Sequence, residues 1–177
     1  MLTNTDQIKI KSLRERLILK EQLLDLIPQP SIQQINYTPY DGNEKYDATW
    51  VELHEITNGK YGAHKVIAEV KIRNYPISAY NGWYIEKDKY DFLINQTEYD
   101  KKLYICIHPD GIQIFNLSKC PEPIWNEQTL PSNNQSEDTK TKIKGDLDKK
   151  YSEKLIKDIK IFEYLDRAQK IFIKRQK

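Results

Sequence analysis

Two charged residues stand where a strand-forming sequence normally carries apolar side chains. Glu69 and Lys71 lie two positions apart in the run Val66–Ile72, whose other members are apolar, and Asp47 comes at the start of the preceding extended segment. Because side chains alternate between the two faces of a strand, Glu69 and Lys71 share one face. A carboxylate and an ammonium in an apolar strand cost free energy unless they are paired, bound to a metal or used in function.

These residue types suit the metal-assisted hydrolysis of a phosphodiester bond. Asp47 and Glu69 can hold a hard divalent cation, with the backbone carbonyl of Val70 as a further ligand and with water and phosphate oxygens completing its shell. Such a cation withdraws charge from the phosphate and acidifies a bound water. Lys71 can orient or deprotonate that water, as the catalytic base, and offset the developing negative charge. The competing interpretation is structural: Glu69 and Lys71 merely pair on one sheet face, and Asp47 is a turn residue.

The surrounding segments predict an alternation of helices and strands. Residues 5–27 carry leucines at helical spacing, and Pro28 and Pro30 cannot continue that helix. Period and composition predict a second helix over 84–96. Strands are predicted for residues 32–37, 46–56, 63–74, 102–108 and 112–117.

The turn between the second and third predicted strands provides a geometric test. Asn58-Gly59 is a hairpin signal, because both residues tolerate positive φ. A strict two-residue turn there would place Asp47 opposite Val70, on the wrong face to meet Glu69. A five-residue loop would instead place Asp47 opposite Lys71, and a β-bulge would also correct the phase. The catalytic hypothesis therefore predicts an odd-length loop or a bulge.

The C-terminal third differs in composition from the rest of the chain. Residues 118–144 are polar and contain prolines, which predicts a flexible linker. Residues 145–177 predict an amphipathic basic helix that packs on the core or on a partner, with Leu155, Ile159, Phe162 and Leu165 as its apolar stripe. Between Thr139 and Lys177 there are 13 Lys and Arg against 6 Asp and Glu. This asymmetry favours an anionic partner.

Asp47, Glu69-x-Lys71 and the order helix, three strands, helix, strand resemble the PD-(D/E)XK nuclease superfamily over residues 5–117. The resemblance implies an α/β, restriction-endonuclease-like core of helix, three strands, helix and two strands over residues 1–117, to which the predicted linker and C-terminal helix are appended. It also implies dependence on Mg²⁺ or Mn²⁺ and cleavage of nucleic acid, with DNA preferred over RNA. Tyr46 stands where the name-giving proline would be. No Gln-x-x-x-Tyr signature follows the third strand, which argues against the exonuclease branch.

The resemblance points to accessory residues as well. The first helix would supply a further acid from Glu15 or Glu21, and the second helix a basic residue from Lys87 or Lys89, of which Lys89 is preferred. For each of these, a solvated helix face is the alternative.

Candidate nucleic-acid contacts follow the charged strand. Arg73 continues the face of Glu69 and Lys71 and can contact phosphate. The aromatic residues after it can stack on bases or simply pack the loop; they are Tyr75, Tyr80, Trp83 and Tyr84.

Other classes of protein are disfavoured. No segment approaches the roughly 18 consecutive apolar residues of a membrane span, so no membrane partner is expected. Cys106 and Cys120 form no disulfide framework and show no zinc-site spacing with the histidines, and a cytoplasmic location follows as the default. The sequence therefore predicts a divalent-metal endonuclease acting on DNA, with a homodimer compatible with a core of this size. The alternatives are an inactive nuclease-like module that binds DNA or a protein partner, and a purely structural protein.

Overall fold

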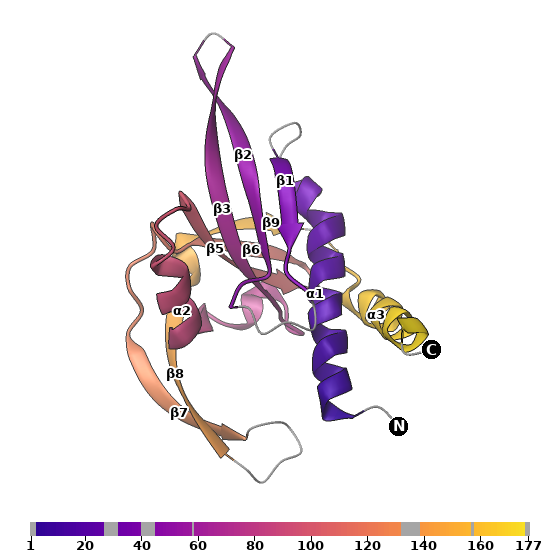
Figure 1. The fold of residues 1–177 in the computed structure, drawn as a ribbon. Coiled ribbons are helices and arrows are strands. Elements are labelled where there is room, and N and C mark those ends of the chain that lie inside the picture. Colours follow the sequence, from indigo (N-terminus) through magenta and orange to yellow (C-terminus); the bar gives the residue numbers. More distant parts are fainter. Residues whose placement is uncertain are drawn as a thin grey trace.

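The computed structural model describes residues 3–26, 32–39, 45–57, 59–131, 139–156 and 158–175. These residues form a mixed α/β fold with three α-helices and two β-sheets (Figure 1). Among them, no helix is long and apolar enough to cross a membrane. The prolines predicted to end the first helix lie outside the described residues.

The larger sheet has six strands in the order β1-β2-β3-β5-β6-β9. Their bounds are β1 Ile32–Tyr37, β2 Ala48–Thr57, β3 Lys60–Ile72, β5 Lys101–His108, β6 Gly111–Asn116 and β9 Ser152–Ile156. Strands β3 and β5 are parallel, and all other neighbours are antiparallel. A parallel pair needs a crossover connection, and here it runs through β4 (Gly82–Glu86) and helix α2 (Lys87–Ile94). Residues 84–86, predicted to be helical, therefore belong to a strand.

Both faces of this sheet are covered, which explains the apolar character of β3. On one face, Ala68 and Val70 pack in a cluster with Ile18 and Leu19 of helix α1 (Asn4–Leu26). On the other face, Ile67 packs in a cluster with β4 and α2. Since side chains alternate along a strand, Glu69 and Lys71 point to the α2 side, as Ile67 does.

The hairpin of β2 and β3 contains the predicted change of register. Thr57 pairs with Lys60 across a turn in which Gly59 has a φ of 77°, and the register then shifts between Glu55 and Thr57. From Glu55 opposite Tyr61 onward, the pairing stays regular as far as Ala48 opposite Ala68. A two-residue turn is thus combined with a bulge, so the expected phase correction is confirmed, whereas the five-residue loop is not what forms. Figure 1 shows this hairpin projecting beyond the rest of the molecule.

The smaller sheet has three antiparallel strands in the order β4-β8-β7, with β7 at Trp125–Pro131 and β8 at Thr139–Asp148. The prediction of a flexible linker over residues 118–144 is therefore wrong for these two segments; residues 132–138 lie outside the described residues. Strand β8 is polar, but β4 provides a partner for its backbone, and Leu147 and Trp125 pack with α2 and β4. A polar segment can form a strand when a neighbouring strand pairs with its backbone, so the polar composition of residues 118–144 did not predict β7 and β8.

The predicted C-terminal helix over residues 145–177 is also corrected. Helix α3 spans only Ile161–Arg175, because the preceding residues pair with other strands as β8 and β9. The later start changes the buried stripe, which consists of Ile161, Tyr164, Ala168 and Phe172. Phe162, predicted to be in that stripe, is 63% exposed, and Leu155 lies in β9. Helix α3 packs on α1, where Ala168 and Phe172 share a cluster with Ile10 and Leu13.

Candidate active site

The bulged hairpin brings Asp47 next to Glu69. The backbone N–H of Asp47 donates to the carbonyl oxygen of Ala68 at 2.8 Å, which continues the ladder of β2 and β3 by one residue. The carboxylate then turns onto β3, where its Oδ2 accepts a hydrogen bond from the N–H of Val70 at 2.7 Å. Asp47 is only 7% exposed and Glu69 only 1%. Two buried carboxylates from neighbouring strands therefore lie together at the head of β2.

Two lysines converge on the buried Glu69 carboxylate. The Nζ of Lys71 lies 2.6 Å from Glu69 Oε1, and the Nζ of Lys89, from the first turn of α2, lies 3.0 Å from the same oxygen. The lysine side chains are 30% and 22% exposed, so their ammonium groups extend from the carboxylate toward solvent. The structure therefore brings Lys89, the preferred basic residue of the second helix, to the predicted centre.

Helix α1 contributes a buried acid to the same place. Glu15 is 4% exposed, and its Oε1 accepts from the N–H of Ile72, the last residue of β3, at 3.4 Å. Glu21 lies elsewhere, because its carboxylate accepts from Arg167 at 2.6 and 2.9 Å and from the Tyr164 hydroxyl at 2.9 Å. Of the two predicted helix acids, the structure brings Glu15 to the site, while Glu21 joins α1 to α3.

A cation that the sequence analysis did not single out lies beside Asp47. The guanidinium Nη2 of Arg16 is 3.8 Å from Asp47 Oδ1 and donates to the Thr38 hydroxyl at 2.5 Å. Thr38 in turn donates its backbone N–H to the Asp47 carbonyl at 3.0 Å. Nothing in the local sequence distinguishes Arg16 from Arg14, since the contact joins three separate segments of the chain.

Burial and mutual repulsion dominate the electrostatics of the acids. Burial, and next the carboxylate of Glu15, raise the pKa of Asp47. Burial also raises the pKa of Glu69, where Lys71 acts against the shift and Asp47 adds to it. Burial disfavours the charge on Lys71, but Glu69, Glu15 and Asp47 outweigh it and raise the pKa of Lys71 well above its ordinary value. The buried acids thus raise the cost of one another's charges, and the nearby cations lower it.

A cavity of about 100 Å³ lies beside Glu69, and Asp47 and Glu15 are not among the residues that line it. Glu69, Lys71 and Lys89 line it, together with Arg73, which follows on the same face of the chain as predicted. The Arg73 guanidinium donates to the Tyr84 carbonyl at 3.0 Å and to the Tyr104 hydroxyl at 2.9 Å.

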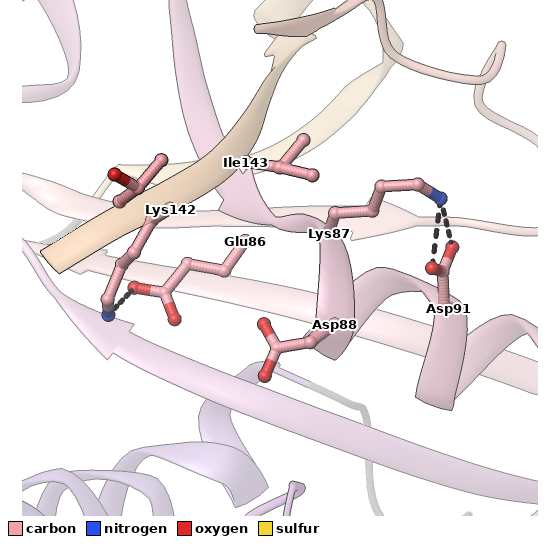
Figure 2. Close-up of a pocket in the computed structure, with 7 residues that line it drawn as sticks. Glu86, Lys87, Asp88, Asp91, Lys142 and Ile143 are labelled. Carbon is pink, nitrogen blue, oxygen red and sulfur yellow. Dashed lines mark hydrogen bonds and ion pairs between the residues drawn. The ribbon is translucent and has the colours of Figure 1, made fainter. Parts of the chain in front are cut away.

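Two other predicted nucleic-acid contacts lie outside this cavity. Lys87 pairs with Asp91 at 2.8 Å along α2, and Figure 2 shows this pair lining a separate pocket in which Lys142 contacts Glu86. Tyr75 is 55% exposed and lines a neighbouring cavity. Lys89 and Arg73 therefore face the candidate site directly, whereas Lys87 does not.

Asp47 and Glu69 are the two acids of this site that could contribute ligands to a hard divalent cation. Asp47 and Glu69 are adjacent, buried and mutually repelling, and a divalent cation would remove the cost of their charges. In the part of the chain that the structure describes, no group of three or more His, Cys, Asp or Glu residues could hold a metal ion. The two carboxylates would therefore be supplemented by non-side-chain oxygens, as hard cations accept.

Comparison with models of protein families, with curated proteins and with solved structures finds no match to this chain.

Proposed function

We propose that the protein is a divalent-metal-dependent endonuclease that hydrolyses phosphodiester bonds, most readily in DNA. One observation supports this above all: a β-bulge brings Asp47 to Glu69, and Lys71 and Lys89 both contact the Glu69 carboxylate. An ion pair of purely structural use would need neither a second lysine nor two further buried acids.

The topology supports the same proposal. Helix α1, the antiparallel strands β1, β2 and β3, the crossover through α2, the parallel strand β5 and the antiparallel strand β6 follow the order that a restriction-endonuclease-like core implies. In this interpretation β4, β7, β8, β9 and α3 are additions to the core. A homodimer and a cytoplasmic location stay predictions.

Each residue of the site has a role in the proposed hydrolysis. Asp47, Glu69 and the carbonyl of Val70 would hold Mg²⁺ or Mn²⁺, which when bound supplies Lewis acidity at the phosphate and acidifies water. Lys71 would orient the attacking water as a cation. Its raised pKa keeps it protonated, which argues against the predicted role of catalytic base, so the proton of the water would pass to solvent. The water oxygen would form a bond to phosphorus, the bond from phosphorus to one sugar oxygen would break, and that oxygen would take a proton from solvent.

Two further cations would act on the substrate without exchanging protons. Lys89 lies on the same Glu69 oxygen as Lys71 and would offset negative charge on the phosphate in the transition state. Arg73, next along the cavity, would position the neighbouring phosphate.

Cleavage assays test the proposal. Wild type and Lys71→Ala are incubated with supercoiled plasmid and with single-stranded DNA, with and without Mg²⁺ or Mn²⁺. We expect metal-dependent cutting that falls about 10²- to 10³-fold in Lys71→Ala, as loss of one group that stabilises transition-state charge implies. Lys65→Ala, at an exposed position of the same strand, is the matched control and should cut as wild type does. Cutting that persists undiminished in folded Lys71→Ala would contradict the assignment.

A second candidate is a nuclease-like module that binds DNA, or a protein partner, without cutting. The observation in its favour is that two ammonium groups already lie within ion-pair distance of Glu69 Oε1. Absence of cutting by folded wild type, together with oligonucleotide binding that Arg73→Ala weakens, would support this alternative.

A further inference from the structure

A second, larger cavity adjoins the candidate active site. Its volume is about 500 Å³, within the range of roughly 300–1,000 Å³ that is usual for ligand pockets. Four residues line both cavities, namely Lys11, Ile72, Arg73 and Tyr84. A ligand that reaches the catalytic residues can therefore extend directly into the second cavity.

Two exposed aromatic rings line the far side of this cavity. Tyr75 is 55% exposed and Tyr80 51% exposed, and their rings meet edge to face with centroids 5.8 Å apart. The segment that carries them is anchored, since Trp83 contacts the Tyr80 ring at 5.3 Å and is itself buried, with its indole N–H on Gln113 at 2.6 Å. Because the segment is anchored, the two exposed rings are held in place before a ligand stacks on them.

The charges divide the cavity into two ends. Lys11 and Arg73 lie on the side shared with the active site, whereas Asp146 lines the second cavity but not the first. The Tyr84 ring is already engaged, because Arg73 lies 4.6 Å and Lys144 Nζ 3.9 Å from its centroid. Cations thus border the active site, and the two open tyrosine rings and a carboxylate lie beyond them.

The chemical groups of a nucleotide are complementary to the two ends of this cavity. Its phosphate matches the cationic border, its base matches the aromatic end, and base amino groups can donate to a carboxylate such as Asp146. A free phosphate ion would not use the aromatic rings and would be repelled by Asp146. A base inside a duplex is stacked on both sides and must leave the stack to meet a protein ring.

Building on the proposed nuclease function, we propose that this cavity binds the unpaired base of a nucleotide next to the scissile phosphate. The substrate is therefore nucleic acid with a single-stranded or splayed nucleotide at the cleavage site, rather than fully paired duplex.

The test measures binding in the absence of divalent metal, so that no cleavage occurs. A short single-stranded oligonucleotide with one fluorescent base analogue, and the same strand annealed to its complement, are titrated with wild type, Tyr75→Ala, Tyr80→Ala and Tyr80→Phe. We expect the two alanine variants to bind the single strand about 5- to 100-fold more weakly, as loss of base stacking implies. Tyr80→Phe keeps its ring and should bind as wild type does.

The matched control is Tyr61→Ala, which removes a 64% exposed tyrosine from the projecting hairpin. Alanine variants that bind the single strand as tightly as Tyr61→Ala does would overturn the proposal, as would an equal loss of affinity for single strand and duplex. Metal-dependent cutting of duplex that is insensitive to Tyr75 and Tyr80 would refute the subsite and leave the nuclease intact. Tyr80-dependent binding of single strands without any cutting would support the subsite and refute the nuclease.

Discussion

Replacing Asp47 by asparagine should stabilise the protein without metal and remove its response to metal. The folded-state pKa of Asp47 is raised by burial and by Glu15, so the protonated form stabilises the fold, and this contribution is lost as pH rises through the folded-state pKa. Asparagine is uncharged at every pH, and its carbonyl oxygen can still accept from the Val70 N–H. The free energy of unfolding should therefore be equal or higher in Asp47→Asn.

The expected response of the wild type to metal follows from mass action. A ligand present at one hundred times its Kd raises the free energy of unfolding by about 2.7 kcal/mol. For a chain of 177 residues, each kcal/mol raises Tm by about 2–4 °C. Saturating Mg²⁺ or Mn²⁺ should therefore raise the Tm of the wild type by about 5–11 °C. Asp47→Asn lacks one of two carboxylate ligands and should show almost none of this rise.

Thermal unfolding with increasing Mg²⁺ or Mn²⁺ measures both effects in one experiment. Asp91→Asn is the matched control, because Asp91 pairs with Lys87 on α2 outside the candidate site, and it should respond to metal as wild type does. If metal raised the Tm of Asp47→Asn as much as that of the wild type, the assignment of Asp47 as a ligand would be refuted. A lower Tm of Asp47→Asn without metal would refute the electrostatic reasoning.

Three further predictions concern other parts of the molecule. Glu15→Gln should lower the cleavage rate about 10- to 100-fold, as loss of a group that supports metal ligands does, whereas Glu21→Gln should cut at the wild-type rate in the same assay. Burial lowers the pKa of His108, so its neutral form stabilises the fold and this contribution is lost as pH falls; the Tm difference between wild type and His108→Gln should shrink from about pH 7.5 to about pH 5. In urea unfolding, Phe172→Ala should lower the free energy of unfolding by about 3–5 kcal/mol, and the exposed control Phe162→Ala should lower it by less than about 0.5 kcal/mol.

The core of the candidate site was predictable because its signal is local. Glu69 and Lys71 stand out within seven residues of β3. Side-chain alternation then requires a bulge or an odd number of loop residues to put Asp47 on the face of Glu69, and the structure has a bulge. The position of the bulge was not predictable, since the register of β2 depends on which of its side chains the rest of the fold buries, and Trp50 is one of them.

The periphery of the site was harder to predict, because it is formed by contacts between distant segments. Glu15 and Glu21 both lie on α1, and the structure shows that Glu21 contacts Arg167 of α3 while Glu15 enters the site. Arg16 is one of several basic residues on the same helix, and it reaches Asp47 only because Thr38 follows β1 beside it.

The C-terminal third shows how pairing overrides composition. The polar segment of β8 and the charged segment of β9 have little propensity of their own, and each becomes a strand because an unpaired strand edge is available at β4 or β6. The start of α3 then shifts to Ile161 and turns Phe162 outward.

The sequence by itself determined the alternation that puts Glu69 and Lys71 on one face and the helical period of α1, since these follow from periods of two and 3.6 residues along a continuous segment. The tertiary structure alone decided which acid of α1 enters the site, that Lys89 joins Lys71 on Glu69, and that the aromatic cavity adjoins them. These depend on the distances between elements far apart in the chain, which packing sets and local period does not.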